Sequence, residues 1–240
     1  MKTRFARLDT IRGCALVSMI AYHASWDLVY LFGLDWPWYH SFGAYVWQQS
    51  ICWTFILLSG YCWSLGRRQF RRGLTVFACG AAVTGVTWAL MPSNLVFWGV
   101  LSLLGAASML LVPFAPLLRR IPPRLGLGVS FALFLLLRDV NSGWLGFEGL
   151  RVLRLPAGLY RNWFTACLGF PFDGFFSTDY FPLLPWFFLF LTGFFLRRLQ
   201  PEDAAGGRPR PLVTWMGRHS LAVYMLHQPA AFGALWLLFH

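Results

Sequence analysis

The stretch LVFWGVLSLLGAASMLLVPFA, residues 95–115, decides the fold class, because it has no charged residue over a length that can cross a membrane. A helix needs about 20 mostly apolar residues to cross the ~30 Å hydrocarbon core of a bilayer. Arg119 and Arg120 follow the stretch, and basic residues commonly border a membrane-spanning helix on its cytoplasmic side. The stretch therefore predicts a transmembrane helix.

The same criteria, applied along the whole chain, predict seven membrane spans. The first span contains His23 and Asp27 and the last contains His227, so the spans are not purely apolar. We predict an all-α polytopic membrane protein, in which a bundle of about seven transmembrane helices forms a single domain over residues 1–240. The predicted spans are approximately 11–33, 43–65, 74–92, 95–115, 125–138, 180–197 and 212–238.

The composition excludes an ordinary soluble domain and a nucleic-acid-binding protein. Of the 240 residues, 58% are hydrophobic and only 12% are charged, whereas roughly a quarter of the residues in soluble domains are charged. Lys and Arg number 20 against nine acidic residues, which gives a net charge of +11. These basic residues occur in short clusters between apolar runs rather than on a polar surface, so we expect membrane lipid and not nucleic acid as the surroundings.

The basic clusters predict the orientation. With the N-terminus in the cytoplasm, 16 of the 20 basic residues fall at or near the inner face, and the positive-inside rule then favours N-in and C-out. A single lysine among these residues is compatible with a GC-rich bacterial genome, so we predict a bacterial inner membrane. The inner-face residues are Lys2, Arg4, Arg7, Arg12, Arg67, Arg68, Arg71, Arg72, Arg119, Arg120, Arg124, Arg197, Arg198, Arg208, Arg210 and Arg218, and the outer-face residues are Arg138, Arg151, Arg154 and Arg161.

Two connections between the spans differ in composition. Residues 139–179, between spans five and six, hold many Trp and Phe residues, which predicts an outer cap that folds back onto the bilayer surface or over a cavity mouth. Residues 198–210 are polar and rich in Pro and Gly, which predicts a cytoplasmic linker. The five cysteines lack the spacing of a disulfide framework or a zinc site, so we expect no metal.

Ionisable side chains inside a membrane are costly, so those within the spans are candidate functional residues. His23 lies 11 residues beyond Arg12, which is roughly 16 Å along a helix. Asp27 lies four residues further on, on the same helical face. A carboxylate beside an imidazole can orient the ring for nucleophilic or general-base chemistry. The alternative is a polar pair that joins neighbouring helices.

Other polar residues lie near the ends of the spans. Asp9 can cap the first helix, while Arg12 can reach the headgroups or bind an anionic ligand. Arg218, His219 and His227 form a polar stripe in the last span that can bond to neighbouring helices or take part in chemistry. Asp179 precedes the sixth span and can be its cap, and His40 lies among aromatic residues in the first outer loop.

Four blocks of the sequence occur in a characteristic order. They are RLDTIRGCALVSMIAYHASWD (7–27), FILLSGYCWSLGRR (55–68), DYFPLLPWFFLFLTGFFL (179–196) and GRHSLAVYMLHQP (217–229). Together they resemble the heparan-alpha-glucosaminide N-acetyltransferase catalytic-domain family, including its short bacterial members of unassigned function. The resemblance spans nearly the whole chain. It implies a membrane acyltransferase that takes an acyl group from acyl-CoA at the cytoplasmic face and delivers it to an acceptor on the outer side.

The resemblance also suggests roles for single residues. His23 and Asp27 match the family pattern and are the candidate catalytic residues, and His40 is the alternative by its spacing back from Ser59 and Gly60. Acetyl-CoA or another acyl-CoA is the expected donor, and an amine or hydroxyl of a sugar-like molecule is the expected acceptor. We assign Arg12, Arg218 and His219 to binding of the donor, and Asp179, Tyr180 and His227 to binding of the acceptor.

Two other functions remain open from the sequence. Ionisable residues in spans are also typical of small proton-coupled transporters. A membrane scaffold subunit could use the aromatic outer loop as a partner surface, and a homo-oligomer is compatible with either function. Neither alternative predicts the ordered set of four blocks.

Overall fold

A computed structural model of the chain describes residues 6–200 and 210–239. In this part, seven helices of 14 residues or more make up most of the chain, and each overlaps one of the predicted ranges. Lys2, Arg4, Arg208 and most of the predicted linker 198–210 lie outside the described residues. The seven helices are α1 (Ala6–Tyr30), α2 (Phe42–Trp63), α3 (Gln69–Leu90), α4 (Val100–Leu118), α5 (Pro123–Leu136), α7 (Leu183–Leu199) and α9 (Ser220–Phe239).

Three of these helices, α3, α4 and α9, are long and apolar enough to cross a membrane. α5 is apolar but has only 14 residues. α7 has 17 residues, and α1 carries Asp9, Arg12 and Asp27, which lower its hydropathy. The protein is therefore mostly helical with three candidate spans, and the other four spans stay predictions together with the orientation.

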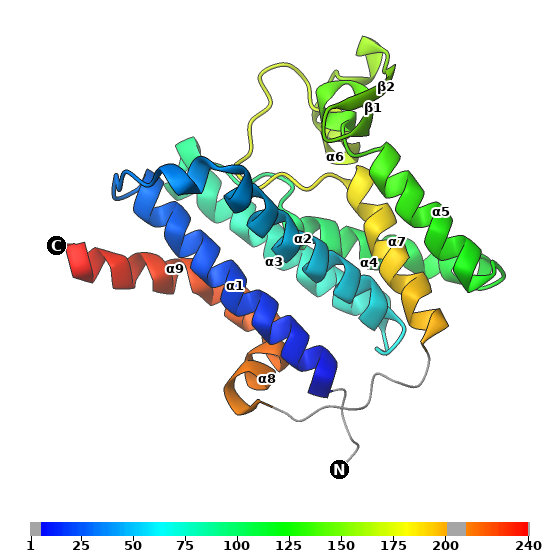
Figure 1. The fold of residues 1–240 in the computed structure, drawn as a ribbon, viewed down its shortest axis with the longest axis horizontal. Helices are drawn as coiled ribbons and strands as arrows, with labels where there is room; N and C mark the ends of the chain where they lie inside the picture. Colours follow the sequence, from blue (N-terminus) through cyan, green and yellow to red (C-terminus); the bar gives the residue numbers. More distant parts are fainter. Residues whose placement is uncertain (1–5, 201–209, 240) are drawn as a thin grey trace. The chain divides into compact units, whose positions relative to one another are not determined.

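Contacts divide the chain into two compact units. Unit 1 holds the residues up to Leu58 and from Gln200 onwards, and unit 2 holds Ser59–Leu199. In unit 1, α1 packs along α9 and along the short helix α8 (Pro211–Arg218), as Figure 1 shows. Its core contains Leu16, Met19 and Ile51, which are buried against one another.

The crossing of α1 and α8 brings two backbones into direct contact. A Cβ atom on Gly13 would lie 1.9 Å from the carbonyl oxygen of Val213, and one on Gly217 would lie 1.8 Å from the carbonyl oxygen of Asp9. Neither distance is compatible with a side chain, so both positions require glycine for the close approach. The arginines that neighbour these glycines, Arg12 and Arg218, are thereby held at the same crossing.

In unit 2, α3 and α4 form a closely packed antiparallel hairpin. Here too glycines permit the approach, since a Cβ atom on Gly105 would lie 2.4 Å from the backbone nitrogen of Phe77. α5 packs against α7, as Figure 1 also shows. Between these two helices Thr192 donates a hydrogen bond of 3.0 Å to Ser130, and both side chains are buried.

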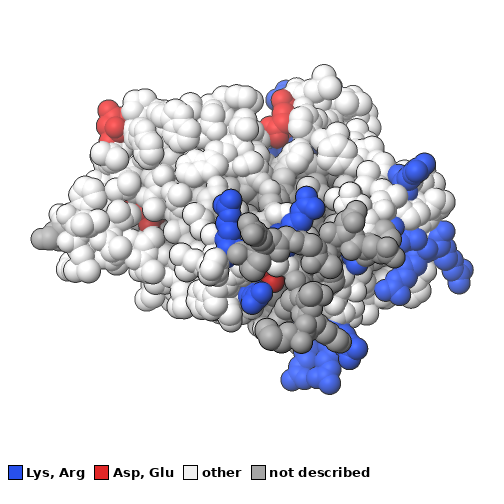
Figure 2. Space-filling model, turned by 60° about the horizontal axis from the view of Figure 1, so that its bottom comes forward, with Lys and Arg blue, Asp and Glu red and all other residues white. Residues whose placement is uncertain are grey.

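The basic clusters of unit 2 gather at one end of its helices. Arg198, at the end of α7, donates to the carbonyl oxygens of Leu118, Arg119 and Ile121 at 3.1, 2.9 and 2.9 Å. Arg68 precedes α3, whose beginning lies near the end of α4 in the antiparallel hairpin. Figure 2 shows where Lys and Arg side chains reach the surface on one face of the molecule. Within unit 2, this grouping agrees with loops on one side of a membrane.

The segment 139–179, predicted as a long aromatic loop in an all-α protein, contains a short β-hairpin, so the fold is mostly rather than entirely helical. β1 (Trp144–Phe147) pairs antiparallel with β2 (Leu150–Arg154), and α6 (Trp163–Leu168) follows. The carboxylate of Asp139 accepts hydrogen bonds from the backbone nitrogens of Glu148 and Gly149 at 3.1 and 2.8 Å, which holds the hairpin turn. Strands of four and five residues are too short for their alternation to be recognised among aromatic residues.

The predicted last span, 212–238, is also divided. α8 ends at Arg218 and α9 begins at Ser220. His219 lies between them with φ −104° and ψ 28°, which are not helical values. Arg218 and His219 therefore lie at a helix junction rather than inside an apolar helix. This position avoids the cost of a charge within the membrane span.

Candidate functional site

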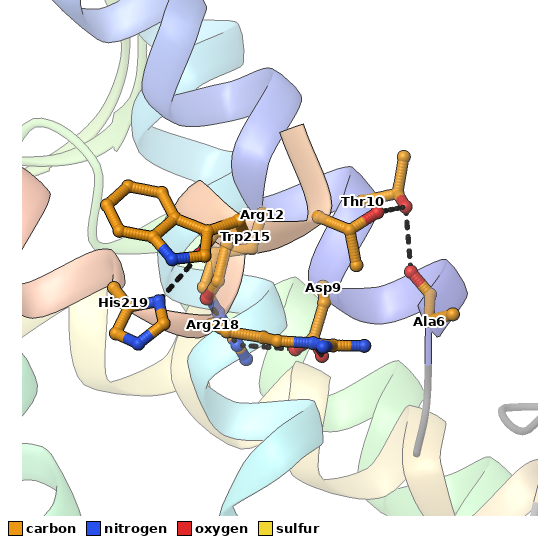
Figure 3. Close-up of polar contacts among 9 residues, drawn as sticks. Ala6, Asp9, Thr10, Arg12, Trp215, Arg218 and His219 are labelled. Carbon is orange, nitrogen blue, oxygen red and sulfur yellow. Dashed lines mark hydrogen bonds and ion pairs between the residues drawn. The ribbon is translucent and has the colours of Figure 1, made fainter. Parts of the chain in front are cut away.

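The first polar cluster lies at the crossing of α1 and α8 in unit 1 (Figure 3). Arg12 Nη1 lies 3.4 Å from Asp9 Oδ1, and Arg218 Nε lies 3.4 Å from Asp9 Oδ2. Arg12 also donates to the carbonyl oxygen of Gly217 at 3.3 Å. Each carboxylate oxygen of Asp9 therefore has a cationic partner from a different position in the chain.

The predicted capping role of Asp9 is wrong, because Asp9 lies inside α1 and not before it. Its charge is used by the two arginines instead. The neighbouring residue Thr10 donates to the carbonyl oxygen of Ala6 at 2.8 Å and meets the hydroxyl of Thr214 at 2.9 Å. This contact links α1 to α8 a second time, so the crossing is held by glycine contacts, ion pairs and a hydroxyl pair.

Arg12 and Arg218 lie at this crossing and His219 follows at the end of α8, while their assignment to the donor stays a prediction. The Arg218 side chain is 43% exposed, and a guanidinium has five N–H donors, so its bond to Asp9 leaves others available. His219 is exposed, and its Nδ1 lies 3.0 Å from the carbonyl oxygen of Trp215. Among the described residues, no group of three or more His, Cys, Asp or Glu could hold a metal ion.

The second polar cluster joins α1 to α9, also in unit 1. Gln228 Nε2 donates a hydrogen bond of 2.6 Å to Asp27 Oδ1. The imidazole rings of His23 and His227 lie with their centroids 4.9 Å apart. Asp27 is completely buried and His227 is 9% exposed. We call these four residues the α1–α9 cluster.

The α1–α9 cluster has three buried acceptor atoms without a hydrogen-bond partner among the described residues. They are Asp27 Oδ2, His227 Nε2 and Gln228 Oε1. His227 Nδ1 bonds to the carbonyl oxygen of Tyr224, and since a carbonyl can only accept, Nδ1 carries the hydrogen and Nε2 presents a lone pair. A buried polar atom without a partner costs about 1–3 kcal/mol. A ligand with several N–H or O–H groups would recover this energy.

The structure brings His23 and Asp27 onto one helical face, as the sequence predicts, but gives them different partners. No hydrogen bond joins the two side chains in the described part of the chain. Asp27 is bound by Gln228, and His23 packs against His227. Sequence reasoning gave Gln228 no role in the site. Its signal was an amide next to a histidine in an otherwise apolar helix.

His40, the alternative catalytic histidine, lies outside this cluster. It belongs to the 3₁₀ helix η1 (Pro37–His40), is exposed, and has ring contacts of 6.0 Å with both Tyr30 and Tyr39. These contacts are typical of an aromatic surface residue. Within unit 1, His23 is thus part of the α1–α9 cluster, whereas His40 contacts the aromatic rings of Tyr30 and Tyr39.

Asp179 and Tyr180, which we assigned to the acceptor, have structural partners in unit 2. Asp179 Oδ2 accepts a hydrogen bond of 3.1 Å from the backbone nitrogen of Val100, so it caps α4 and not the sixth predicted span. Burial raises the pKa of Asp179 to about 6, against the opposing effect of that N–H group. Tyr180 donates a hydrogen bond of 2.5 Å to the carbonyl oxygen of Ala166.

Three helices long and apolar enough to cross a membrane indicate a helical integral membrane protein, and one of them, α9, contributes to the buried cluster of carboxylate, amide and imidazole groups. The chain belongs to the family described as heparan-alpha-glucosaminide N-acetyltransferase, catalytic, whose model matches residues 4–229. The resemblance of the four sequence blocks is thereby confirmed, and membership indicates an acetyltransferase in general terms. No curated protein and no solved structure gives a significant match.

Proposed function

We propose that this protein is a membrane-embedded acyltransferase that moves an acetyl or other acyl group from cytoplasmic acyl-CoA to an amine on the outer side. The observation that carries this proposal is the α1–α9 cluster, in which His23, Asp27, His227 and Gln228 meet with three open acceptor atoms. Membership in an acetyltransferase family supplies the type of reaction.

The donor is proposed to bind at the crossing of α1 and α8. Guanidinium groups bind phosphates through paired hydrogen bonds, and Arg12 and Arg218 both lie at this crossing. His219 lies beside them at the helix junction. Along α1 the distance from Arg12 to His23 is roughly 16 Å at 1.5 Å per residue. The pantetheine arm would cover that distance, so the charged part of CoA need not cross the membrane.

The transfer itself has two routes that lead to the same products. In the direct route, the acceptor nitrogen attacks the thioester carbonyl, the new C–N bond forms and the C–S bond breaks. The proton leaves the nitrogen for a base in the cluster, and the CoA thiolate takes up a proton. In the covalent route, His23 first accepts the acyl group with release of CoA, and the amine then attacks the acyl-imidazole.

The open atoms of the cluster favour an amine over a hydroxyl. Asp27 Oδ2, His227 Nε2 and Gln228 Oε1 are all acceptors, and a primary amine brings two or three N–H groups where a hydroxyl brings one O–H. A sugar-like acceptor such as glucosamine presents such an amine beside several hydroxyls. The segment around Asp179 and Tyr180 is a separate candidate for contact with the rest of the acceptor.

The test uses the full chain in lipid nanodiscs with acetyl-CoA labelled on the acetyl group, and glucosamine or glycerol as acceptor. Wild type is expected to release CoA and label glucosamine, and His23→Ala to lose at least about 100-fold of that rate. His40→Ala is the matched comparison, because its ring lies outside the α1–α9 cluster. Activity lost in His40→Ala but kept in His23→Ala would reverse the assignment.

Failure of every acceptor would contradict the proposal as a whole. If neither CoA release nor labelling is seen with amines or polyols, flux of ions or solutes in proteoliposomes without acyl donor would support a transporter. A stable partner in mild detergent without CoA binding would support a scaffold subunit.

A further inference from the structure

The carboxylate of Asp27 has an arrangement that packing alone does not explain. It is completely buried, and its one hydrogen-bond partner among the described residues is the neutral amide of Gln228, on Oδ1. Its second oxygen has no partner. A structural carboxylate at such depth would be expected to have both oxygens satisfied, since each open acceptor costs stability. The hydrogen bond from Gln228 to Oδ1 fixes the orientation of the Asp27 carboxylate and leaves Oδ2 available as an acceptor.

The geometry points to Gln228 as a positioning residue, which holds the Asp27 carboxylate by Oδ1 so that Oδ2 receives the proton of the acceptor's reacting group. The inference rests on the proposed acyl transfer and assigns within it the group that takes the proton. Gln228 acts through Asp27 and is not itself a catalytic residue. His23 remains the partner of His227, whose ring it contacts.

The orientation of the Gln228 amide follows from its partner. Because a carboxylate can only accept from a neutral amide, the Gln228 nitrogen must face Asp27 Oδ1, and Oε1 must face away from it. Gln228 Oε1 and His227 Nε2 then add two acceptors to the one at Asp27 Oδ2. A nucleophile bound by these atoms would donate one of its hydrogens directly to Asp27.

The proton balance of the step is complete. As the acceptor nitrogen forms its bond to the acyl carbon, one N–H bond breaks and the proton moves to Asp27 Oδ2. The bond from the acyl carbon to its leaving group, either the CoA sulfur or the His23 nitrogen, breaks at the same centre. Asp27 then returns the proton to that leaving group, directly or through water, which restores the carboxylate. The direct route yields the amide and CoA thiol in this step. In the covalent route the step yields the amide and neutral His23, because CoA has already left as the thiol with the proton that the imidazole lost on acylation. No other reactant is needed.

If Asp27 and Gln228 had a purely structural role, their variants would behave differently. Exchanging the two side chains distinguishes the structural role from the positioning role. The double variant Asp27→Asn with Gln228→Glu keeps both shapes and restores an amide-to-carboxylate hydrogen bond, but the carboxylate now belongs to α9. If the pair only joins α1 to α9, the exchange restores stability and activity together. If Gln228 positions the Asp27 carboxylate, the exchange restores stability alone.

The experiment measures melting temperature, kcat and the KM for acetyl-CoA in nanodiscs, with glucosamine as acceptor. We expect Gln228→Glu alone to lower the melting temperature, because two carboxylates then face each other. We expect Asp27→Asn alone, and the double variant, to melt within about 3 °C of wild type with kcat about 100-fold lower and an unchanged KM for acetyl-CoA. Gln228→Leu should lower kcat by about 10-fold, again without a change in that KM.

Two results would overturn the inference. The first is a double variant with the kcat of wild type, which would make the pair a structural contact. The second is Gln228→Leu that is folded and fully active. If Gln228→Leu does not fold, the double variant still decides. A wild-type protein that transfers no acetyl group to any acceptor would instead contradict the proposed function, so the two failures are distinguishable.

Discussion

The two carboxylates of α1, Asp9 and Asp27, lie in opposite environments. Both oxygens of Asp9 meet arginines, from one turn further along α1 and from α8. Asp27 has a neutral amide on one oxygen and no partner on the other within the described residues. The same residue type in the same helix is therefore satisfied at one place and left open at the other.

The difference distinguishes a carboxylate that stabilises the fold, Asp9, from one whose burial is unfavourable for stability, Asp27. Asp9 forms ion pairs with two arginines at a helix crossing, so its presence is explained by packing and charge. Asp27 gains a single hydrogen bond in return for complete burial, which is unfavourable for stability taken alone. Such groups persist where function requires them, and this supports the α1–α9 cluster as the reactive end of the site.

The largest effect is expected where α1 and α8 touch. Gly217→Leu would place a side chain against the carbonyl oxygen of Asp9, where a Cβ atom alone would lie at 1.8 Å. The helices must then separate, which would break the ion pair between Arg218 and Asp9 and the hydrogen bond from Arg12 to the carbonyl oxygen of Gly217. We expect a loss of at least about 3 kcal/mol of stability, measured by thermal unfolding in detergent with tryptophan fluorescence.

Gly233→Ala is the matched control in α9. A Cβ atom there would have no atom within 4 Å, and alanine has the better helix propensity by up to about 1 kcal/mol. Its melting temperature should equal or exceed that of wild type. Equal melting of Gly217→Leu and wild type would show that the Asp9 crossing does not depend on the glycine contact.

The substitutions Asp9→Asn and Asp27→Asn test the comparison, because we expect only the first to lower stability. Asp9→Asn removes the anion from two ion pairs and should lower stability by about 1–2 kcal/mol. Asp27→Asn keeps the shape and the amide contact while it removes a buried carboxylate, so stability should stay the same or rise. Urea or thermal unfolding of both variants tests this, and an equal loss in both would remove the distinction between the two carboxylates.

In the part of the chain that the structure describes, Asp179 has no ion pair like those of Asp9, but it accepts one hydrogen bond from a backbone nitrogen. We expect its substitution to have the smallest effect on stability. Burial raises its pKa from 3.8 to about 6, so the folded state binds the proton more tightly than the unfolded chain does. Its contribution to stability is full below pH 4 and is lost as the pH rises through 6. Relative to Asp179→Asn, wild type should gain roughly 1 kcal/mol as the pH falls from 7.5 to about 5.2.

Asn at position 179 is a suitable reference, because its carbonyl can still accept from the Val100 nitrogen and it does not titrate. Thermal unfolding of both proteins across this pH range gives the difference directly. A difference that does not vary with pH would mean that the Asp179 carboxylate is solvated in the folded state.

The helices could be predicted from the sequence more completely than the site. Each apolar range corresponds to a helix because hydropathy over about 20 residues is a local property. The prediction failed where local signals were weak, at the short strands of residues 144–154 and at the break at His219. His23, Asp27 and His227 were recognised because ionisable residues stand out in apolar helices. Gln228 was not, because an amide carries no charge.

The sequence by itself determined the helical class, the family and the list of polar residues inside the spans. Only the tertiary structure decided which of these residues meet. Asp27 and Gln228 are 201 positions apart, and Asp9 and Arg218 are 209 apart. Their pairing depends on how α1 crosses α8 and α9. The crossing of α1 and α8 depends on backbone contacts of Gly13 with Val213 and of Gly217 with Asp9. Each contact joins residues from opposite ends of the chain, so it depends on the tertiary structure.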